Sequence, residues 1–283
     1  MDIDLARVFK NAVRKEDGDF TVDGLLYCGK CKQPKQARTI VEGAEIVIPD
    51  VCECERRRRE QERERENRER REEHVRTWKK RCFGAFGEDG VRIGEKMRFD
   101  EDRTEAESDA EKICRKYAER FGIALEKNYG LVLYGNVGVG KTYLAACICS
   151  KVIENEFTAV FCNLASVAHN VISIKESERE EAASVLRSTD LVVIDDFGVE
   201  RKSEYMDEAV QRAIDIRYQS GKPIIITTNL TPDDFKNPMS VAQRRIFSRI
   251  IEMCRFIEVD GADRRKKLHN DKNRDFKKDI EEG

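Results

Sequence analysis

Residues 130–145 read GLVLYGNVGVGKTYLA, and this stretch decides the fold. It contains the pattern G-x-x-x-x-G-K-[ST], which begins at Gly135 and ends with Gly140, Lys141 and Thr142. The pattern stands between an apolar run and an amphipathic segment, where a phosphate-binding loop joins a strand to a helix. Glycines let such a backbone curl so that its N–H groups point at phosphate oxygens. The stretch therefore predicts an α/β domain that binds a nucleotide.

The same loop predicts which residues hold ATP. Lys141 is expected to reach the β- and γ-phosphates, and the Thr142 hydroxyl is expected to bind Mg²⁺. A glycine-rich turn that matches by chance is the alternative, but the flanking strand and helix argue against it. The residues expected to contact the nucleotide are Gly135, Asn136, Val137, Gly138, Val139, Gly140, Lys141, Thr142 and Tyr143.

A second apolar run ends in acidic side chains. Residues 189–200 read TDLVVIDDFGVE, so an apolar strand leads into Asp195 and Asp196. Asp195 is expected to hold Mg²⁺ through water, and Asp196 to orient or deprotonate the attacking water. Glu200 lies nearby and is an alternative base.

A third apolar run, KPIIITTNL at 222–230, ends in Thr228 and Asn229. An asparagine at the carboxyl end of a strand could contact the γ-phosphate or the lytic water. The alternative is an asparagine in an ordinary turn.

Strands and helices alternate through the second half of the chain. Apolar strands that alternate with amphipathic helices indicate a parallel sheet covered by helices on both faces. A glycine-rich linker is expected at 82–103, and a helix at 106–121 before the first strand. Strands are predicted at 130–135, 158–163, 190–195, 223–228 and 255–259, and helices at 141–154, 165–174, 178–188, 205–219 and 239–253.

These motifs, in this order, resemble the AAA+ ATPases. The motifs that carry the resemblance are GLVLYGNVGVGKTYLAACI, LVVIDDFGVE and IIITTNL, with SRI at 248–250, GADRR at 261–265 and the entry segment MRFDED at 97–102. Specifically, they resemble the DnaC/DnaI-type loaders of replicative helicases and the related IstB-type transposition helpers. The resemblance implies an AAA+ P-loop NTPase with strand order 5-1-4-3-2, which places the Asn229 strand between the P-loop strand and the Asp195 strand.

The resemblance also implies how hydrolysis occurs. AAA+ proteins hydrolyse ATP between subunits, so we expect self-association and an arginine from the neighbour at the γ-phosphate. Arg249 in SRI matches that position, and Arg245 is an alternative one turn earlier. Arg265 in GADRR matches the second sensor arginine of the family, with Arg264 adjoining it. Asp196 stands where many AAA+ ATPases have glutamate, so we expect slow or partner-stimulated hydrolysis.

Two cysteine pairs precede this domain, Cys28 with Cys31 and Cys52 with Cys54. Four thiolates suit tetrahedral Zn²⁺, and hairpin-like turns separated by strands would bring the pairs together. The second pair, C-x-C, is tighter than the usual C-x-x-C. His74 is an alternative ligand beyond the charged segment, and a redox pair would need a βαβ context that is absent. The other cysteines stand in apolar surroundings and are expected to pack in the core.

Charge divides the remaining chain. Charged residues make up 38% of the 283 residues, but the net charge is only −2, so overall charge does not favour nucleic acid. Nine Arg and eight Glu fill residues 55–73, which predicts an exposed connecting helix; a nucleic-acid-binding arm is the alternative. The domains expected are a zinc-binding, helicase-docking domain at 1–54, a charged helix and linker at 55–103, an AAA+ ATPase domain at 104–262 and a charged tail at 263–283.

The sequence lacks the features of a secreted or membrane protein. Its first residues have no apolar signal-peptide core, and its apolar runs are far below membrane-spanning length. We therefore expect a cytoplasmic protein with no membrane partner, in which ten cysteines do not form a disulfide framework.

Three functions remain open. The first is an ATPase that loads a DnaB-type hexameric helicase onto DNA, with single-stranded DNA as a second partner. The second is an IstB-type transposition helper that assembles on duplex DNA. The third is a zinc-bearing DNA-binding adaptor whose nucleotide site switches its conformation with little turnover. The cysteine module favours the first.

Overall fold

The structure, a computed structural model, divides into two compact units, Met1–Glu72 and Glu73–Gly283, and each is described by itself. The residues described are 15–41, 43–83, 97–99, 107–163, 175–198, 204–261, 263, 272–274 and 276–281. The predicted helix at 165–174 and most of the predicted linker lie outside these ranges.

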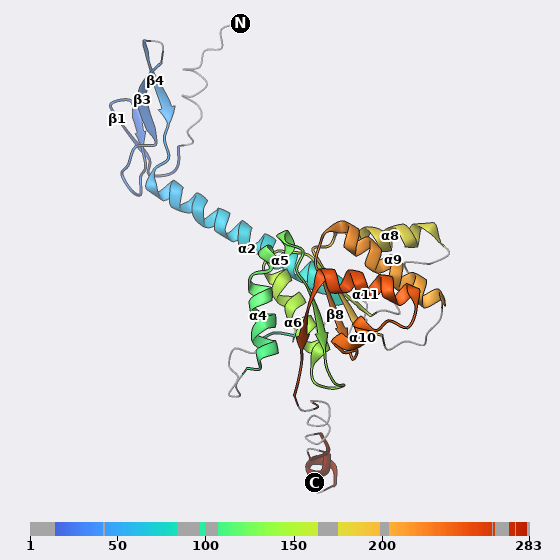
Figure 1. The fold of residues 1–283 in the computed structure, drawn as a ribbon. Helices are drawn as coiled ribbons and strands as arrows, with labels where there is room; N and C mark the ends of the chain where they lie inside the picture. Colours follow the sequence, from blue (N-terminus) through green and yellow to red (C-terminus); the bar gives the residue numbers. More distant parts are fainter. Residues whose placement is uncertain are drawn as a thin grey trace. The chain divides into compact units, whose positions relative to one another are not determined.

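Two antiparallel hairpins build the first unit (Figure 1). β1 (Phe20–Val22) pairs with β2 (Leu25–Tyr27), and β3 (Gln36–Val41) pairs with β4 (Ala44–Pro49). The first cysteine pair lies on a turn after β2, as the sequence predicts. The second pair does not lie on a hairpin-like turn, because Cys52 immediately precedes α2 and Cys54 lies in its first turn.

The charged segment forms part of a longer helix, α2 (Glu53–Phe83). Its charged turns are supported by ion pairs one turn apart, such as Arg59 with Glu55 at 2.7 Å. The expected linker start at residue 82 is wrong, because Cys82 and Phe83 still belong to the helix and are buried. Trp78 packs against the same core, and the Lys79 ammonium forms an ion pair with Glu154 at 2.8 Å, so the last turns of α2 are held by apolar contacts and by one largely buried ion pair.

A five-stranded parallel sheet forms the second unit. Its strands are β5 (Gly130–Tyr134), β6 (Ala159–Asn163), β7 (Leu191–Phe197), β8 (Ile224–Thr228) and β9 (Cys254–Glu258). They are ordered β6-β7-β8-β5-β9, and every described pairing is parallel. Counted along the domain this is 5-1-4-3-2, so the implied order is confirmed.

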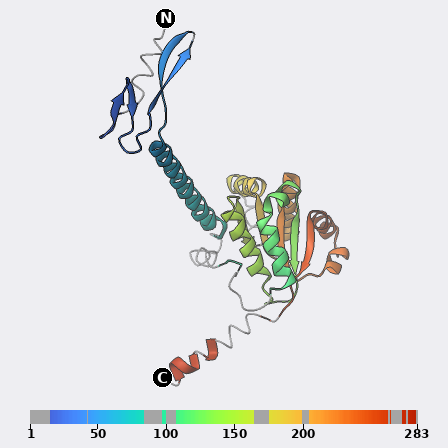
Figure 2. The same ribbon diagram turned by 90° about the vertical axis from the view of Figure 1, so that its left-hand side faces the viewer.

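Helices cover both faces of this sheet, as Figure 2 shows. Successive side chains of a strand point to opposite faces. On β7, Leu191 and Val193 pack in the core that α4, α5 and α6 cover, whereas Val192 and Ile194 pack in the core under α8 to α11. The helices are α4 (Asp109–Glu119), α5 (Phe121–Glu126), α6 (Lys141–Glu154), α8 (Glu176–Ser188), α9 (Glu204–Ser220), α10 (Pro232–Lys236) and α11 (Val241–Met253).

Two helices differ from the prediction. The single helix expected at 106–121 is two, because the chain leaves helical geometry at Arg120, with φ −106° and ψ 26°, before α5 begins. The sequence analysis did not predict α10, although its capping box between Thr231 and Asp234 is a recognisable start signal. The predicted tail contains a short π-helix, η2 (Lys277–Glu281). Within the described ranges, no helix combines the length and the apolarity that crossing a membrane requires.

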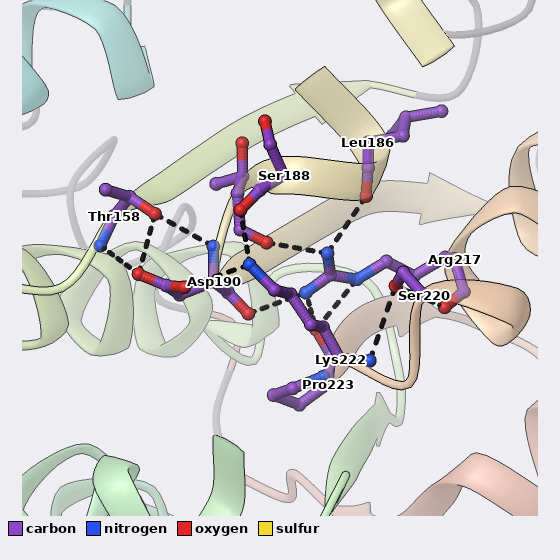
Figure 3. Close-up of polar contacts among 9 residues, drawn as sticks. Thr158, Leu186, Ser188, Asp190, Arg217, Ser220, Lys222 and Pro223 are labelled. Atoms are coloured by element: carbon purple, nitrogen blue, oxygen red, sulfur yellow. Dashed lines mark hydrogen bonds and ion pairs between the residues drawn. The ribbon is translucent and has the colours of Figure 1, made fainter. Parts of the chain in front are cut away.

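A buried arginine ties these elements together at the amino ends of β7 and β8 (Figure 3). Arg217 of α9 is fully buried, and its guanidinium donates to the backbone carbonyls of Leu186, Thr189, Asp190 and Pro223 at 2.6–3.1 Å. Nearby, the Asp190 carboxylate accepts from the Thr158 hydroxyl at 2.8 Å and from the Lys222 ammonium at 3.1 Å. One side chain thus fixes the end of α8, the start of β7 and the start of β8.

Candidate functional site

The phosphate-binding loop joins β5 to α6. Gly140 precedes the helix with φ 105°, a left-handed conformation that side chains disfavour. Gly138 has φ 85°, which is also in the left-handed region that favours glycine, and the Asp263 carboxylate lies close to it. The loop therefore combines unusual backbone angles with close packing, and α6 begins at its end. The first N–H groups of a helix lack partners within the helix itself, which is why a helix N-terminus can bind an anion.

Lys141 is the first residue of α6, and its side chain lies across the loop. Its ammonium donates to the carbonyls of Gly135 at 2.9 Å and Asn136 at 2.7 Å, and to the Asn229 side-chain oxygen at 2.8 Å. Only 6% of Lys141 is exposed. The third predicted strand end therefore lies next to the predicted phosphate lysine, and both polar groups project at the carboxyl edge of the sheet.

A β-bulge places the two aspartates. Ile194 pairs with Ile226 and Phe197 pairs with Thr228, so Asp195 and Asp196 together oppose Thr227 alone. Asp196 is the extra residue of the bulge and has φ 55°. Its backbone N–H donates to the Thr227 hydroxyl at 3.0 Å. As a result Asp195 is buried and Asp196 is exposed.

Asp195 is held by two hydroxyl groups. Its carboxylate accepts from Thr142 at 3.0 Å and from Thr227 at 2.5 Å. Burial raises the pKa of Asp195, and the neighbouring Asp196 adds to the effect, whereas the two hydroxyl groups oppose it. A nearby cation would therefore stabilise the ionised form of this carboxylate.

The donor set at this edge fits magnesium. Mg²⁺ prefers oxygen ligands and usually takes one or two from the protein while keeping several waters. The Thr142 hydroxyl and the Asp195 carboxylate supply two such oxygens 3.0 Å apart, at the N-terminus of α6. Lys141 stands beside them, so one bound triphosphate could contact all three side chains.

The predicted finger arginine is engaged within its own domain. Arg249 of α11 forms an ion pair with Asp215 of α9 at 2.9 Å, and its guanidinium lies 5.8 Å from the Tyr218 ring centre. Arg245, the alternative, is exposed on the same helix. The predicted Arg265, its neighbour Arg264 and the alternative base Glu200 lie outside the described residues.

The first unit brings the cysteine pairs together. The Sγ atoms of Cys28, Cys31 and Cys52 all lie within 4.8 Å of one another. Cys54 stands beside them in the first turn of α2. The backbone N–H groups of Cys54 and Gln33 lower the pKa of Cys31 to about 6, whereas burial raises the pKa of Cys52 and the hydrogen bond with Cys31 raises the pKa of Cys54 to about 11. One sulfur of the cluster thus favours the thiolate form over its neighbours.

This cluster fits a thiolate metal site. Tetrahedral Zn²⁺ with bonds of about 2.3 Å separates its sulfur ligands by about 3.8 Å, which is compatible with the observed cluster. Gln33 links the two pairs, because its backbone carbonyl accepts from the Cys28 N–H and its side chain accepts from the Glu53 N–H, both at 2.8 Å. The alternative ligand His74 instead contacts the Phe157 carbonyl at 3.3 Å in the second unit.

Sequence reasoning missed two groups of residues at these sites. Thr227 contacts both aspartates, and its place one residue before the end of β8 could have suggested it. Asp19 and Lys35 form a buried ion pair at 2.7 Å beside the cysteine turn. No local pattern marks that pair, because its members lie sixteen residues apart on either side of a hairpin.

Comparisons with known proteins agree with this geometry. The model of the IstB-like ATP binding protein family matches residues 102–272. The replicative helicase loader DnaI of Bacillus subtilis is 27% identical over 150 residues, which cover 49% of this chain and 48% of the relative. The replicative helicase loader DnaC of Escherichia coli is 25% identical over 150 residues, which cover 51% of this chain and 60% of the relative. The chain thus spans only about half the length of these relatives.

A solved structure shares the fold. The crystal structure of DnaI has a TM-score of 0.50 at 23% sequence identity and covers 59% of this chain and 93% of the other. This likeness shows the α/β architecture of the AAA+ fold alone.

Proposed function

Since the chain belongs to the IstB-like ATP-binding protein family, we propose that it is an ATPase that loads a replicative ring helicase onto DNA. One observation carries the ATPase part of the proposal. Lys141 contacts Asn229, and Thr142 contacts Asp195, so three strand ends converge where one triphosphate would lie. The names of the two relatives, both replicative helicase loaders, support the loading role.

We assign the chemistry of this site as follows. Lys141 and the loop N–H groups bind the β- and γ-phosphates, and Asn229 is released from Lys141 to contact the γ-phosphate or the attacking water. Thr142 and Asp195 hold the magnesium ion, which neutralises charge on the phosphates when bound. Asp196, exposed beside them, orients or deprotonates the water.

Hydrolysis is proposed to be slow without a partner. Asp196 is one methylene shorter than glutamate, and its position depends on a left-handed backbone conformation. Arg249, the proposed finger, must leave Asp215 before it can reach a neighbouring subunit. Arg265 is the proposed second sensor. Assembly of several copies on single-stranded DNA or on the helicase would supply the missing arginine.

The first unit is proposed to be the helicase-docking domain. Cys28, Cys31, Cys52 and Cys54 would hold a structural Zn²⁺, because a unit whose described residues bury few apolar side chains gains stability from a metal. Gentle chelation should then unfold residues 1–54 and leave nucleotide binding intact. Loss of nucleotide binding on chelation would contradict this division of labour.

The decisive test is co-purification of the full chain with the hexameric replicative helicase of its own source. We expect a complex that depends on ATP and that the Lys141→Met variant fails to form. ATP turnover with and without single-stranded DNA, measured on the same samples, separates an ATPase from a nucleotide-switched adaptor.

A transposition helper is the second candidate, since the matching family takes its name from IstB. Capture of a transposase and not of a helicase, with assembly on duplex DNA, would replace the first proposal with this one.

A further inference from the structure

A buried carboxylate stands behind the cysteine turn of the first unit. Asp19 precedes β1, and only 2% of its side chain is exposed. One carboxylate oxygen accepts from the backbone N–H of Gly29 at 2.9 Å. The other accepts from the Lys35 ammonium at 2.7 Å and from the Glu16 N–H at 2.9 Å. The carboxylate thus has its partners on three separate segments of the chain.

One of those partners belongs to the cysteine turn itself. Gly29 lies between Cys28 and Cys31, and a Cβ at this position would collide with the backbone of Gly18. The segment that carries Asp19 is therefore packed directly against the turn, with no side chain between them. The Asp19 carboxylate thus holds the backbone of the turn at a residue that lies between the two cysteines.

Lys35 fixes the carboxylate from the opposite side. Its backbone N–H donates to the Leu26 carbonyl at 2.7 Å, and its own carbonyl accepts from the Asp50 N–H at 2.9 Å. It therefore joins the first hairpin to the chain that leads into Cys52. The Lys35 ammonium lowers the pKa of Asp19 to about 2, so the carboxylate is ionised at neutral pH.

We propose that Asp19, held by Lys35, is a positioning residue that sets the affinity of the cysteine cluster for zinc. The inference rests on the proposed zinc site. Asp19 binds no metal itself; it fixes the turn that presents two ligands, and Lys35 extends this support toward the second pair. Changes to such groups outside the ligand shell typically cost about 10–100-fold in metal affinity.

Two variants separate the positioning role from a simple effect of charge. Asp19→Ala removes both the charge and the acceptor for Gly29. Asp19→Asn removes the charge but keeps one acceptor oxygen, so the turn remains supported. Positioning predicts a much larger loss for alanine than for asparagine, whereas a pure charge effect predicts similar losses. Glu45→Ala is the matched control, because it breaks an exposed ion pair with Arg38 at 3.6 Å in the same unit.

The experiment measures zinc dissociation constants of the full chain by competition with a chromophoric chelator. It also records the absorption spectrum of the cobalt-substituted protein, which reports the geometry of the thiolates. We expect Asp19→Ala to raise the dissociation constant about 10–100-fold and to change the cobalt bands, with Asp19→Asn intermediate and Glu45→Ala within about twofold of the parent. ATP binding by the second unit serves as a check that each variant is intact.

Two outcomes would overturn the inference. The first is a dissociation constant for Asp19→Ala within about threefold of the parent, with an unchanged cobalt spectrum. The second is an equal loss in the alanine and asparagine variants. If Asp19→Ala does not fold, the cobalt spectra of Asp19→Asn and Glu45→Ala still decide: changed bands in Asp19→Asn alone indicate that the turn has moved, whereas weaker zinc binding with the bands of the parent indicates a charge effect and overturns the inference. A parent chain that holds no zinc would instead overturn the zinc proposal itself, and metal analysis of the purified protein reports this separately.

Discussion

Two buried cations stand at opposite edges of the same sheet. Lys141 lies at the carboxyl ends of the strands and is bonded to two loop carbonyls and one exposed side chain, Asn229. Arg217 lies at the amino ends of β7 and β8, and its five hydrogen bonds go to four backbone carbonyls in the last turn of α8 and in the residues just before β7 and β8. The bonds of Lys141 end on a loop and on an exposed side chain, whereas those of Arg217 end on the backbone beside α8, β7 and β8. We therefore expect Lys141 to serve the proposed nucleotide site and Arg217 to serve stability.

The cost of burial is visible at the amino edge. Burial lowers the pKa of Arg217 to about 10, which still leaves the guanidinium charged at neutral pH. A buried charge is tolerated when hydrogen bonds satisfy it fully. Arg217 meets this condition with carbonyl dipoles alone, and its fixed fork suits four acceptors better than a lysine ammonium would.

The largest expected effect is on folding stability, in the Arg217→Met variant. Removal of the guanidinium leaves four carbonyls without this donor in a buried region, so the free energy of unfolding should fall by about 3–5 kcal/mol. Chemical denaturation measures this loss. The control is Arg212→Met on the exposed side of the same helix, expected to change stability by less than about 0.5 kcal/mol. A loss below about 1 kcal/mol for Arg217→Met would mean that the buried arginine does not stabilise the amino edge of the sheet as we expect.

For Lys141→Met we expect a large effect on activity and a small effect on stability. Loss of the ammonium should lower ATP turnover about 100-fold or more, because one preorganised donor to developing negative charge is typically worth that much. Stability should change little, since the loop carbonyls can turn to water. Steady-state ATP turnover tests the expected loss of activity, and a thermal melt tests the expected small change in stability. Lys151→Met, in the last turn of the same helix, is the control. A large loss of stability with normal turnover would mean that Lys141 supports the fold and not the proposed reaction.

A smaller effect is expected for Asn229→Ala. Asn229 supplies one hydrogen bond at the site, and one such bond is worth about 1.5 kcal/mol, or about tenfold in rate. Turnover should therefore fall about tenfold while nucleotide affinity, measured by titration calorimetry, stays near that of the parent. Asn237→Ala, which alters a polar contact on the exposed surface of α10, is the control. An equal drop in affinity and turnover would indicate that Asn229 holds the nucleotide in its ground state.

The smallest expected effect is the pH dependence of the stability that Asp190 contributes at the amino ends of the strands. Burial opposes the charged form of Asp190, but its bonds to Thr158 and Lys222 prevail and its pKa is lowered. Its contribution to stability is therefore present above the unfolded pKa of about 4 and is lost as pH falls through the lower folded pKa. Asp190→Asn should cost about 1 kcal/mol at pH 7 and progressively less below about pH 4. Denaturation curves at several pH values measure this, and a cost that grows at low pH would have the wrong sign.

The comparison also explains what the sequence could predict. The loop from Gly135 to Thr142 and the aspartates after β7 were predictable, because each is a local pattern next to an apolar strand. Arg217 was not, since nothing within its helix indicates that carbonyls from three other segments converge on it. The partnership of Thr227 with Asp195 likewise depends on the register between two strands that lie far apart in sequence.

The first unit follows the same rule. Four cysteines at suggestive spacing predicted a metal site, and three of their sulfurs do form one cluster. The support of that cluster by Asp19 and Lys35 depends on how two hairpins fold against each other, so spacing alone could not indicate it. The ligand residues can be recognised from short stretches of sequence, whereas the residues that position them come together only when the chain folds.

The bulge in β7 has a consequence for how this site could be lost. Ile194 and Phe197 both pair normally with β8, so deletion of either aspartate would leave a regular ladder with every later residue in place. The pairing of β7 with β8 therefore does not require Asp196, and the folded state accommodates the left-handed backbone conformation of that residue. We therefore expect a variant that lacks Asp196 to keep the pairing of β7 with β8, so that the bulge sets the position of this carboxylate and not the regularity of the sheet.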